Sequence, residues 1–132
     1  MEALKKYLEK RSWKDFESFI SEVFEIHGYK VRKNVRLKYL KNLEIDIIAE
    51  KRDVIFLVEC KKWKKEYSKE RNLKKVVEKH KEKLENFGKF TYKRVYGLII
   101  FLDTTFSPKV YDKIFIISID FLNSFILEFE SR

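Results

Sequence analysis

Apolar residues recur at helical spacing along three segments of the chain. In the first segment, Ser12 is placed to cap a helix, and Gly28 supplies the left-handed residue with which helices commonly end. The apolar face of this predicted helix consists of Trp13, Phe16, Phe19, Ile20, Val23 and Phe24. Glu17 lies beside that face, so we expect its carboxylate at the edge of buried surface. A second helix is predicted over residues 68–87, and a third after Asp120.

Apolar runs between these helices predict β-strands. The strands are predicted over residues 29–36, 44–50, 54–60, 96–102 and 113–119. The third run is almost wholly apolar, which is typical of a strand covered on both faces. The order of elements, α-β-β-β-α-β-β-α, predicts an α/β fold with a mixed central sheet of about five strands flanked by helices. Because no linker or repeat interrupts the pattern, we expect one domain over residues 1–132.

Composition narrows the class of protein. The chain has 132 residues with 16% aromatic residues, three Gly and one Pro, which favours a packed fold over disorder. No apolar run approaches the length of a membrane span, and the N-terminus lacks the apolar core of a signal peptide. The single cysteine, Cys60, fits a reducing compartment. We therefore expect a cytoplasmic protein that does not associate with membranes.

The net charge of +9 is concentrated in two windows. Residues 30–41 contain six basic residues and no acid, and residues 61–83 contain eleven basic and four acidic residues. A focused positive field attracts polyanions, of which nucleic acid is the most common. A solvated, lysine-rich helix face explains the charge equally well. Charge alone leaves both interpretations open.

Acidic residues interrupt two of the apolar strands. Asp46 lies within an Ile-Asp-Ile-Ile run, and Glu59 and Lys61 end the strand over residues 54–60. Side chains two residues apart in a strand point to the same face, so Glu59 and Lys61 are expected together. Buried charges are costly unless they are paired or bind a metal. Neighbouring carboxylates would suit a hard cation such as Mg²⁺, and a buried ion-pair cluster is the alternative.

About half of the chain resembles the PD-(D/E)xK nuclease superfamily. Asp46 stands at the position of the first acid of the motif, and Glu59, Cys60 and Lys61 stand at its ExK tripeptide. Ile45 replaces the proline that usually precedes the first acid. The acid embedded in one strand and the tripeptide at the end of the next are far more specific together than an isolated ExK.

The resemblance extends to the first helix. Phe16 and Glu17, followed by the GYKV stretch that begins at Gly28, look like the opening of Mrr-type restriction endonucleases. Archaeal Holliday-junction resolvases are similar, because they carry a helical glutamate eleven residues before the glycine, as Glu17 stands before Gly28. The glutamate of the tripeptide favours the resolvases, since Mrr-type proteins often carry glutamine there.

The resemblance implies a restriction endonuclease-like fold and metal-dependent hydrolysis of DNA. Asp46 and Glu59 would bind Mg²⁺ or Mn²⁺, with the backbone carbonyl of Cys60 as a third ligand. Lys61 would orient or activate the attacking water. Glu17 would hold a second cation or its water. The alternative for Glu17 is a surface carboxylate paired with a neighbour on its own helix.

The basic windows would then flank the site and bind the DNA backbone. The predicted DNA-binding residues are Arg32, Lys33, Arg36, Lys38, Lys62, Lys64 and Lys65. The small size favours structure-selective cleavage of junctions or branched DNA, in repair or recombination. Resolvases act as homodimers, and the apolar segment 121–129 would supply an interface, unless it simply covers the sheet.

Two rival interpretations remain. An Mrr-like restriction nuclease subunit would take its specificity from another chain. A catalytically silent nuclease fold would only bind nucleic acid, although such a module has no need of Asp46, Glu59 and Lys61. Among the weaker candidates, Glu44 is expected to be a strand-edge carboxylate, and His80 stands alone without metal-ligand spacing.

Overall fold

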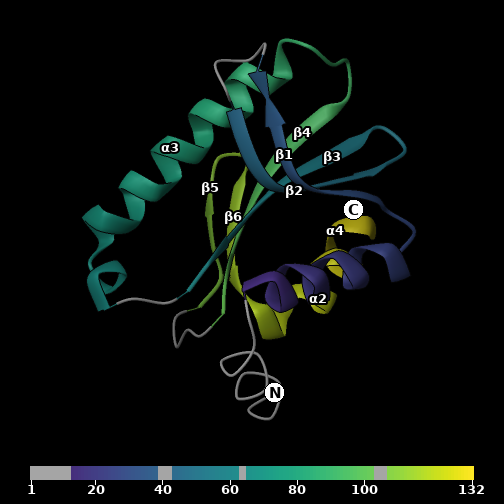
Figure 1. Cartoon of the computed structure of the whole chain (residues 1–132). Helices are drawn as coiled ribbons and strands as arrows, with labels where there is room; N and C mark the ends of the chain where they lie inside the picture. The colour runs from purple at the N-terminus through teal and green to yellow at the C-terminus, as the bar shows by residue number, and fades with distance from the viewer. Residues whose placement is uncertain (1–12, 39–42, 63–64, 103–106) are drawn as a thin grey trace.

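The structure is a computed structural model that describes residues 13–38, 43–62, 65–102 and 107–132 (Figure 1). Its helices are α2 (Trp13–Ile26), α3 (Glu70–Gly88) and α4 (Leu122–Glu130), with short 3₁₀ turns η2 (Lys65–Ser68) and η3 (Ile119–Phe121). Its strands are β1 (Lys30–Leu37), β2 (Leu43–Lys51), β3 (Val54–Lys61), β4 (Arg94–Phe101), β5 (Lys109–Tyr111) and β6 (Ile114–Ser118). No helix in these described ranges is long and apolar enough to cross a membrane.

The strands form one mixed sheet in the order β1-β2-β3-β4-β6-β5. β1, β2 and β3 pair antiparallel, whereas β3, β4 and β6 pair parallel, and α3 makes the predicted crossover between β3 and β4. The α/β class and the mixed sheet are confirmed. The sheet has six strands, where about five were predicted. The additional strand, β5, has only three residues and pairs antiparallel with β6, so it is too short to produce a recognisable pattern.

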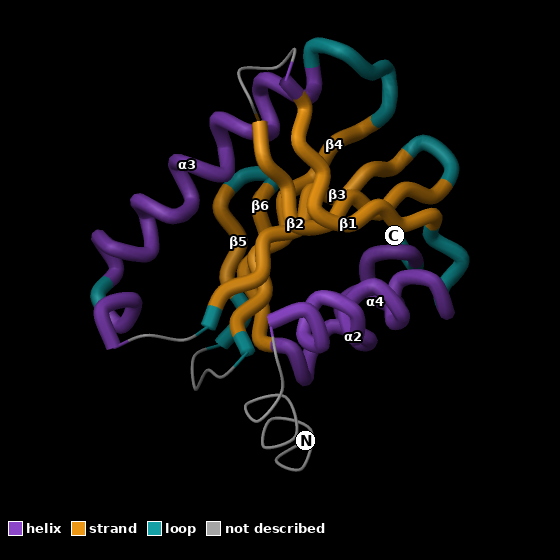
Figure 2. The backbone as a smooth tube through the Cα atoms, in the orientation of Figure 1, coloured by secondary structure: helices purple, strands orange, loops and turns teal. Residues whose placement is uncertain are grey.

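Helices cover both faces of the sheet (Figure 2). α2 and α4 cover one face, over a core that includes Phe56, Val58 and Cys60 of β3. α3 covers the other face, over a core that includes Ile55 and Leu57 of β3. Because β3 is buried on both faces, its sequence is almost wholly apolar, as predicted. Most of the apolar face of α4 packs on the sheet, which is the simpler of the two roles considered for residues 121–129.

The predicted ends of the helices are correct only in part. Gly28 follows α2 with a φ of 87°, the left-handed conformation expected of it. Ser68 does not cap α3, because the residue before that helix is Lys69. Asp120 does not cap α4 either, since it lies within η3 and accepts a hydrogen bond from the Ser118 hydroxyl. Ser12 lies outside the described residues.

The β1–β2 hairpin switches faces halfway along its length. On β1, Val31 packs in the core under α2, whereas Val35, four residues later, packs in the core under α3. On β2, Ile47 and Ile45 divide between the two cores in the same way. Regular alternation would place residues two or four apart on one face. The switch coincides with Asn34, which has a φ of 52°, and with Asp46 opposite it.

Beyond this switch, β2 separates from β3. The last paired residues are Ile47 and Val58, so the end of β3 that carries Glu59, Cys60 and Lys61 has no ladder partner on β2. The hairpin therefore leaves the edge of β3 without a partner from β2 at the positions of the ExK tripeptide. Asp46 stands at the point of separation.

Candidate active site

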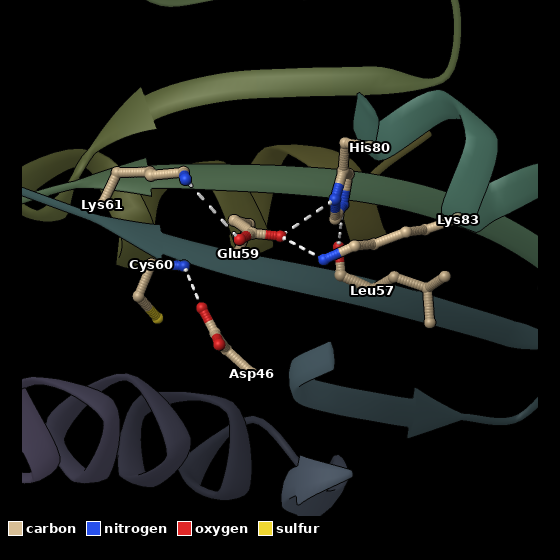
Figure 3. A network of polar contacts seen from close by, with 7 residues as sticks. All are labelled: Asp46, Leu57, Glu59, Cys60, Lys61, His80 and Lys83. Atoms are coloured by element: carbon tan, nitrogen blue, oxygen red, sulfur yellow. Dashed lines mark hydrogen bonds and ion pairs between the residues drawn. The ribbon is translucent and has the colours of Figure 1, made fainter. Parts of the chain in front are cut away.

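Asp46 takes over the hydrogen bond that β2 no longer makes. Its Oδ2 accepts the backbone N–H of Cys60 at 2.9 Å (Figure 3). Burial raises the pKa of Asp46 above its usual value, and the charge of Glu59 raises it further. The Cys60 N–H and the lysines Lys61 and Lys83 act in the opposite direction without cancelling the rise. Asp46 is therefore a carboxylate whose ionised form is poorly compensated by the protein.

Glu17 of α2 approaches Asp46 from the helix above this face. One carboxylate oxygen from each residue and the Sγ of Cys60 all lie within 4.8 Å of one another. Glu17 is buried, with 3% of its surface exposed, so the alternative of a surface carboxylate is wrong. Ser21, one turn later on α2, has a buried hydroxyl without a hydrogen-bond partner among the described residues, so Glu17 is not paired with it. Two acids close together in a buried place form a cluster able to hold a divalent cation.

Cys60 offers this cluster a thiol and a carbonyl. Burial raises the pKa of the thiol well above its usual value, and the charges of Asp46 and Glu17 raise it further, so the thiol stays protonated and is a poor ligand. The carbonyl of Lys61 accepts the N–H of Leu102 on the β4 side. Because carbonyls alternate in direction along a strand, the Cys60 carbonyl points to the opposite edge, where Asp46 lies.

Glu59 points to the other side of β3, towards α3. Figure 3 shows it across the strand from Asp46. Its Oε2 lies 3.1 Å from Lys83 Nζ and 3.4 Å from His80 Nδ1, and its Oε1 lies 3.8 Å from Lys61 Nζ. Burial alone would raise the pKa of Glu59, but His80 and Lys83 outweigh burial and lower the pKa to about 2. Glu59 and Lys61 share a face, as predicted.

His80 fixes α3 against the sheet beneath it. The ring is 2% exposed, and Nε2 lies 2.8 Å from the carbonyl of Leu57 on β3. A Cβ at Gly97, which pairs with Leu57 from β4, would come within 2.7 Å of the His80 ring. Glycine is therefore required at this strand position, because the imidazole occupies the space of a side chain. Lys83 follows one turn after His80 on the same helix and so reaches Glu59.

The predicted site residues thus form two groups on either side of the end of β3. Asp46, Glu17 and Cys60 lie on the α2 side, and Glu59 and Lys61 lie on the α3 side. The two groups interact electrostatically, since Glu59 raises the pKa of Asp46. A single cluster of Asp46, Glu59 and Lys61 was expected, and the structure divides it across the strand.

The predicted DNA-binding residues form an exposed rim. Those with described side chains are Arg32, Lys33, Arg36 and Lys38 on and after β1, and Lys62 after β3, and all five are exposed. Arg36 pairs with Glu44, which is the strand-edge carboxylate expected. A hollow in the β1–β2 hairpin is lined by residues 34–36 of β1 and residues 44–46 of β2, and so includes Asp46. Lys64 and the side chain of Lys65 lie outside the described residues.

The sequence did not indicate the α3 partners of Glu59. In the sequence His80 stands alone without metal-ligand spacing, and Lys83 is one of the eleven basic residues in the window 61–83. Their contacts with β3 depend on how α3 lies across the sheet, which helical spacing does not specify. Gly97 was the available signal, because a glycine inside a strand marks the close approach of another group.

Comparison with known proteins shows which family the chain is similar to. Residues 8–110 match the model of a family described as restriction endonuclease (Mrr_cat). The chain is also similar to an uncharacterized protein of Archaeoglobus fulgidus, with 24% identity over 91 residues that cover 68% of this chain and 70% of that protein. The family match includes α2, the face-switching hairpin and the ExK strand. The chain therefore belongs to the Mrr_cat restriction endonuclease family, within the restriction endonuclease-like PD-(D/E)xK nuclease superfamily.

Proposed function

We propose that this protein is a DNA endonuclease that hydrolyses phosphodiester bonds with the help of Mg²⁺ or Mn²⁺. The observation that carries the proposal is the Asp46 carboxylate at the edge of β3 that β2 leaves unpaired, within 4.8 Å of the buried Glu17 carboxylate. The ionised form of Asp46 is costly to the fold, which makes a binding role the more economical explanation. The family match supports nuclease chemistry at this place.

The donor atoms fit a hard divalent cation. Asp46, Glu17 and the Cys60 carbonyl supply oxygen, which Mg²⁺ and Mn²⁺ prefer, and the protonated thiol of Cys60 does not compete. Glu59 would join them from the α3 side. When bound, such a cation supplies Lewis-acid stabilisation of the charge that develops at phosphorus and makes the attacking water more acidic.

Lys61 acts on the same reacting centre. Its side chain is 31% exposed and lies beside Glu59, so the ammonium is both near the acids and open to a substrate. We assign to Lys61 the orientation of the attacking water and a contact with the scissile phosphate. An ammonium suits both roles, because it donates hydrogen bonds and carries a charge opposite to that of the phosphate.

The exposed rim gives the substrate a way to bind. Arg32, Lys33 and Lys38 lie along the hairpin that leads to Asp46, and Lys62 follows Lys61. Such residues contact backbone phosphates without reading the base sequence. We therefore propose selectivity for DNA shape, such as junctions or branched DNA in repair or recombination, by a homodimer. The homodimer predicts that light scattering will show a mass of two chains at high concentration.

A second candidate is an Mrr-like restriction nuclease that obtains its specificity from another chain. The family match favours this candidate, because the model that fits residues 8–110 is the restriction endonuclease one. The two candidates share one active site and differ in the substrate. A panel of linear duplex, flap and four-way-junction DNA separates them: preferential cleavage of junctions supports the first, and weak or equal cleavage of all substrates supports the second.

The same panel tests the site itself. Asp46→Asn and Lys61→Ala should lose cleavage while keeping most of their affinity for DNA. The matched control is Glu44→Gln, which removes an exposed carboxylate two residues from Asp46 on the same strand. Cleavage that survives in both site variants would refute the site assignment. Tight, salt-sensitive binding by the wild type without any cleavage would instead indicate a silent nuclease fold.

A further inference from the structure

The carboxylate of Glu59 has two competing uses. Its Oε2 pairs with Lys83 Nζ at 3.1 Å, and both side chains are largely buried, with 18% and 16% exposed. A carboxylate whose charge is already shared with an ammonium is a weaker ligand for a cation. A divalent cation that takes Glu59 as a ligand therefore competes with Lys83 for that charge, and it binds better when Lys83 has another partner.

We propose that Lys83 exchanges partners, from the Glu59 carboxylate to a backbone phosphate of the nucleic acid, and so releases Glu59 to the divalent cation when substrate binds. This inference rests on the proposed function. It makes Lys83 a phosphate-binding residue that couples substrate binding to cation binding. It also explains why an ammonium on α3 faces an acid of the ExK tripeptide, which already has Lys61 beside it.

The placement of Lys83 on α3 provides the second partner. Lys75, Lys79 and Lys83 recur every four residues, so they form one ridge on the helix. Lys75 and Lys79 are exposed, and in the described part of the chain neither forms a salt bridge. A ridge of lysines attracts the phosphate backbone, and this one ends at Glu59. A phosphate that follows the ridge reaches Lys83 last.

The exchange itself is chemically balanced. A phosphate and a carboxylate are both anionic oxygen acceptors, so Lys83 keeps a charge-assisted hydrogen bond throughout. Glu59 loses one cationic partner and gains another, while His80 stays anchored to the Leu57 carbonyl. The cation competes with Lys83 for the charge of the Glu59 carboxylate, and the substrate phosphate draws Lys83 away. Substrate and cation must therefore strengthen each other's binding by the same factor.

The test measures binding rather than cleavage. Mn²⁺ affinity is determined by electron paramagnetic resonance on the protein alone. The affinity for a short phosphorothioate duplex, checked for intactness on a gel, is measured by fluorescence anisotropy with and without Mn²⁺. In the wild type, Mn²⁺ should tighten duplex binding by about fivefold or more. In Lys83→Met, Mn²⁺ should bind the protein alone about fivefold more tightly, and its effect on duplex binding should be much smaller.

Lys79→Met is the matched control, because it removes the same charge from the same ridge without touching Glu59. It should weaken duplex binding and leave Mn²⁺ affinity of the protein alone close to the wild-type value. Equal Mn²⁺ affinities in Lys83→Met and Lys79→Met would overturn the inference. If Lys83→Met does not fold, as judged by circular dichroism, Lys83→Gln is read in the same way.

Asp46→Asn separates this failure from failure of the proposed function. The variant should weaken Mn²⁺ binding whatever Lys83 does. If it weakens binding while Lys83→Met changes nothing, the cation site stands and the exchange of partners is wrong. If Asp46→Asn leaves Mn²⁺ affinity unchanged, the proposed function itself loses its site, and the inference falls with it.

Discussion

The Cys60 N–H donates to Asp46 Oδ2 at 2.9 Å, at a point where β2 no longer pairs with β3. One carboxylate thereby accepts the Cys60 N–H that has no partner on β2, and it lies on the side of β3 to which the Cys60 carbonyl points. The face switch of the hairpin makes this arrangement possible, because continued pairing would fill the edge with backbone groups of β2. The site therefore forms because β2 separates from β3 at Asp46.

Asp46→Asn should stabilise the fold while it abolishes cleavage. The folded-state pKa of Asp46 lies above its ordinary value of 3.8, so the ionised side chain destabilises the fold increasingly as the pH rises through that raised pKa. Asparagine is neutral and still accepts the Cys60 N–H through its Oδ1. We expect a gain of about 1 kcal/mol at neutral pH in urea unfolding. A loss of stability of similar size would show that the ionised Asp46 side chain does not destabilise the fold.

Glu59→Gln should have the opposite, pH-dependent effect. The folded-state pKa of Glu59 is about 2, below the ordinary value of 4.5, so its ionised form stabilises the fold fully above about pH 4.5. The stabilisation is lost as the pH falls towards 2. We expect the variant to be less stable by about 1–3 kcal/mol at neutral pH, and the difference to narrow below pH 4.5. A difference that is independent of pH would refute this role.

Gly97→Ala should destabilise the protein by about 1–3 kcal/mol, since the added methyl group meets the His80 ring at 2.7 Å. Thermal unfolding measures the effect. Gly88→Ala is the control, because a Cβ there meets nothing within 4 Å and the position lies at the end of α3. It should be neutral or slightly stabilising. Equal effects of the two substitutions would show that His80 does not require the space at Gly97.

Arg32→Ala should weaken DNA binding and reduce its dependence on salt. Each lost phosphate contact lowers the slope of log affinity against log salt by about one. Lys109→Ala is the control, because Lys109 is an exposed cation on β5, at the other edge of the sheet from β1. It should leave the slope unchanged. The same decrease in slope for both variants would show that DNA binds by net charge rather than at the rim.

The sequence predicted the main elements, and it singled out Asp46, Glu17 and Cys60, which the structure brings close together. β3 is buried on both faces, so its apolar run was unmistakable, and Asp46 and Glu59 were conspicuous as acids in apolar strands. β5 was missed because three residues carry no periodicity. These signals are local, and local pattern is sufficient where burial alone determines the residue type.

The division of the site across β3 was not predictable in the same way. It depends on the left-handed conformation of Asn34, where the hairpin switches faces, and on the crossing of α3 that brings Lys83 to Glu59. Neither follows from residue type or spacing. Gly97 was the one sign of that crossing in the sequence. The reason for the glycine is visible only in the structure, where the His80 ring occupies the space of a side chain at this position.

The most direct test of the proposed function is the Mg²⁺-dependent rate of DNA cleavage by the wild type, Asp46→Asn and Glu44→Gln under identical conditions. The proposed function predicts that Asp46→Asn is slower by about 100-fold or more, because an acid at the reacting centre is lost, and that Glu44→Gln stays close to the wild type. Equal cleavage by the wild type and Asp46→Asn, with each rate dependent on Mg²⁺, would contradict the assignment of the active site to the edge of β3 beside Asp46.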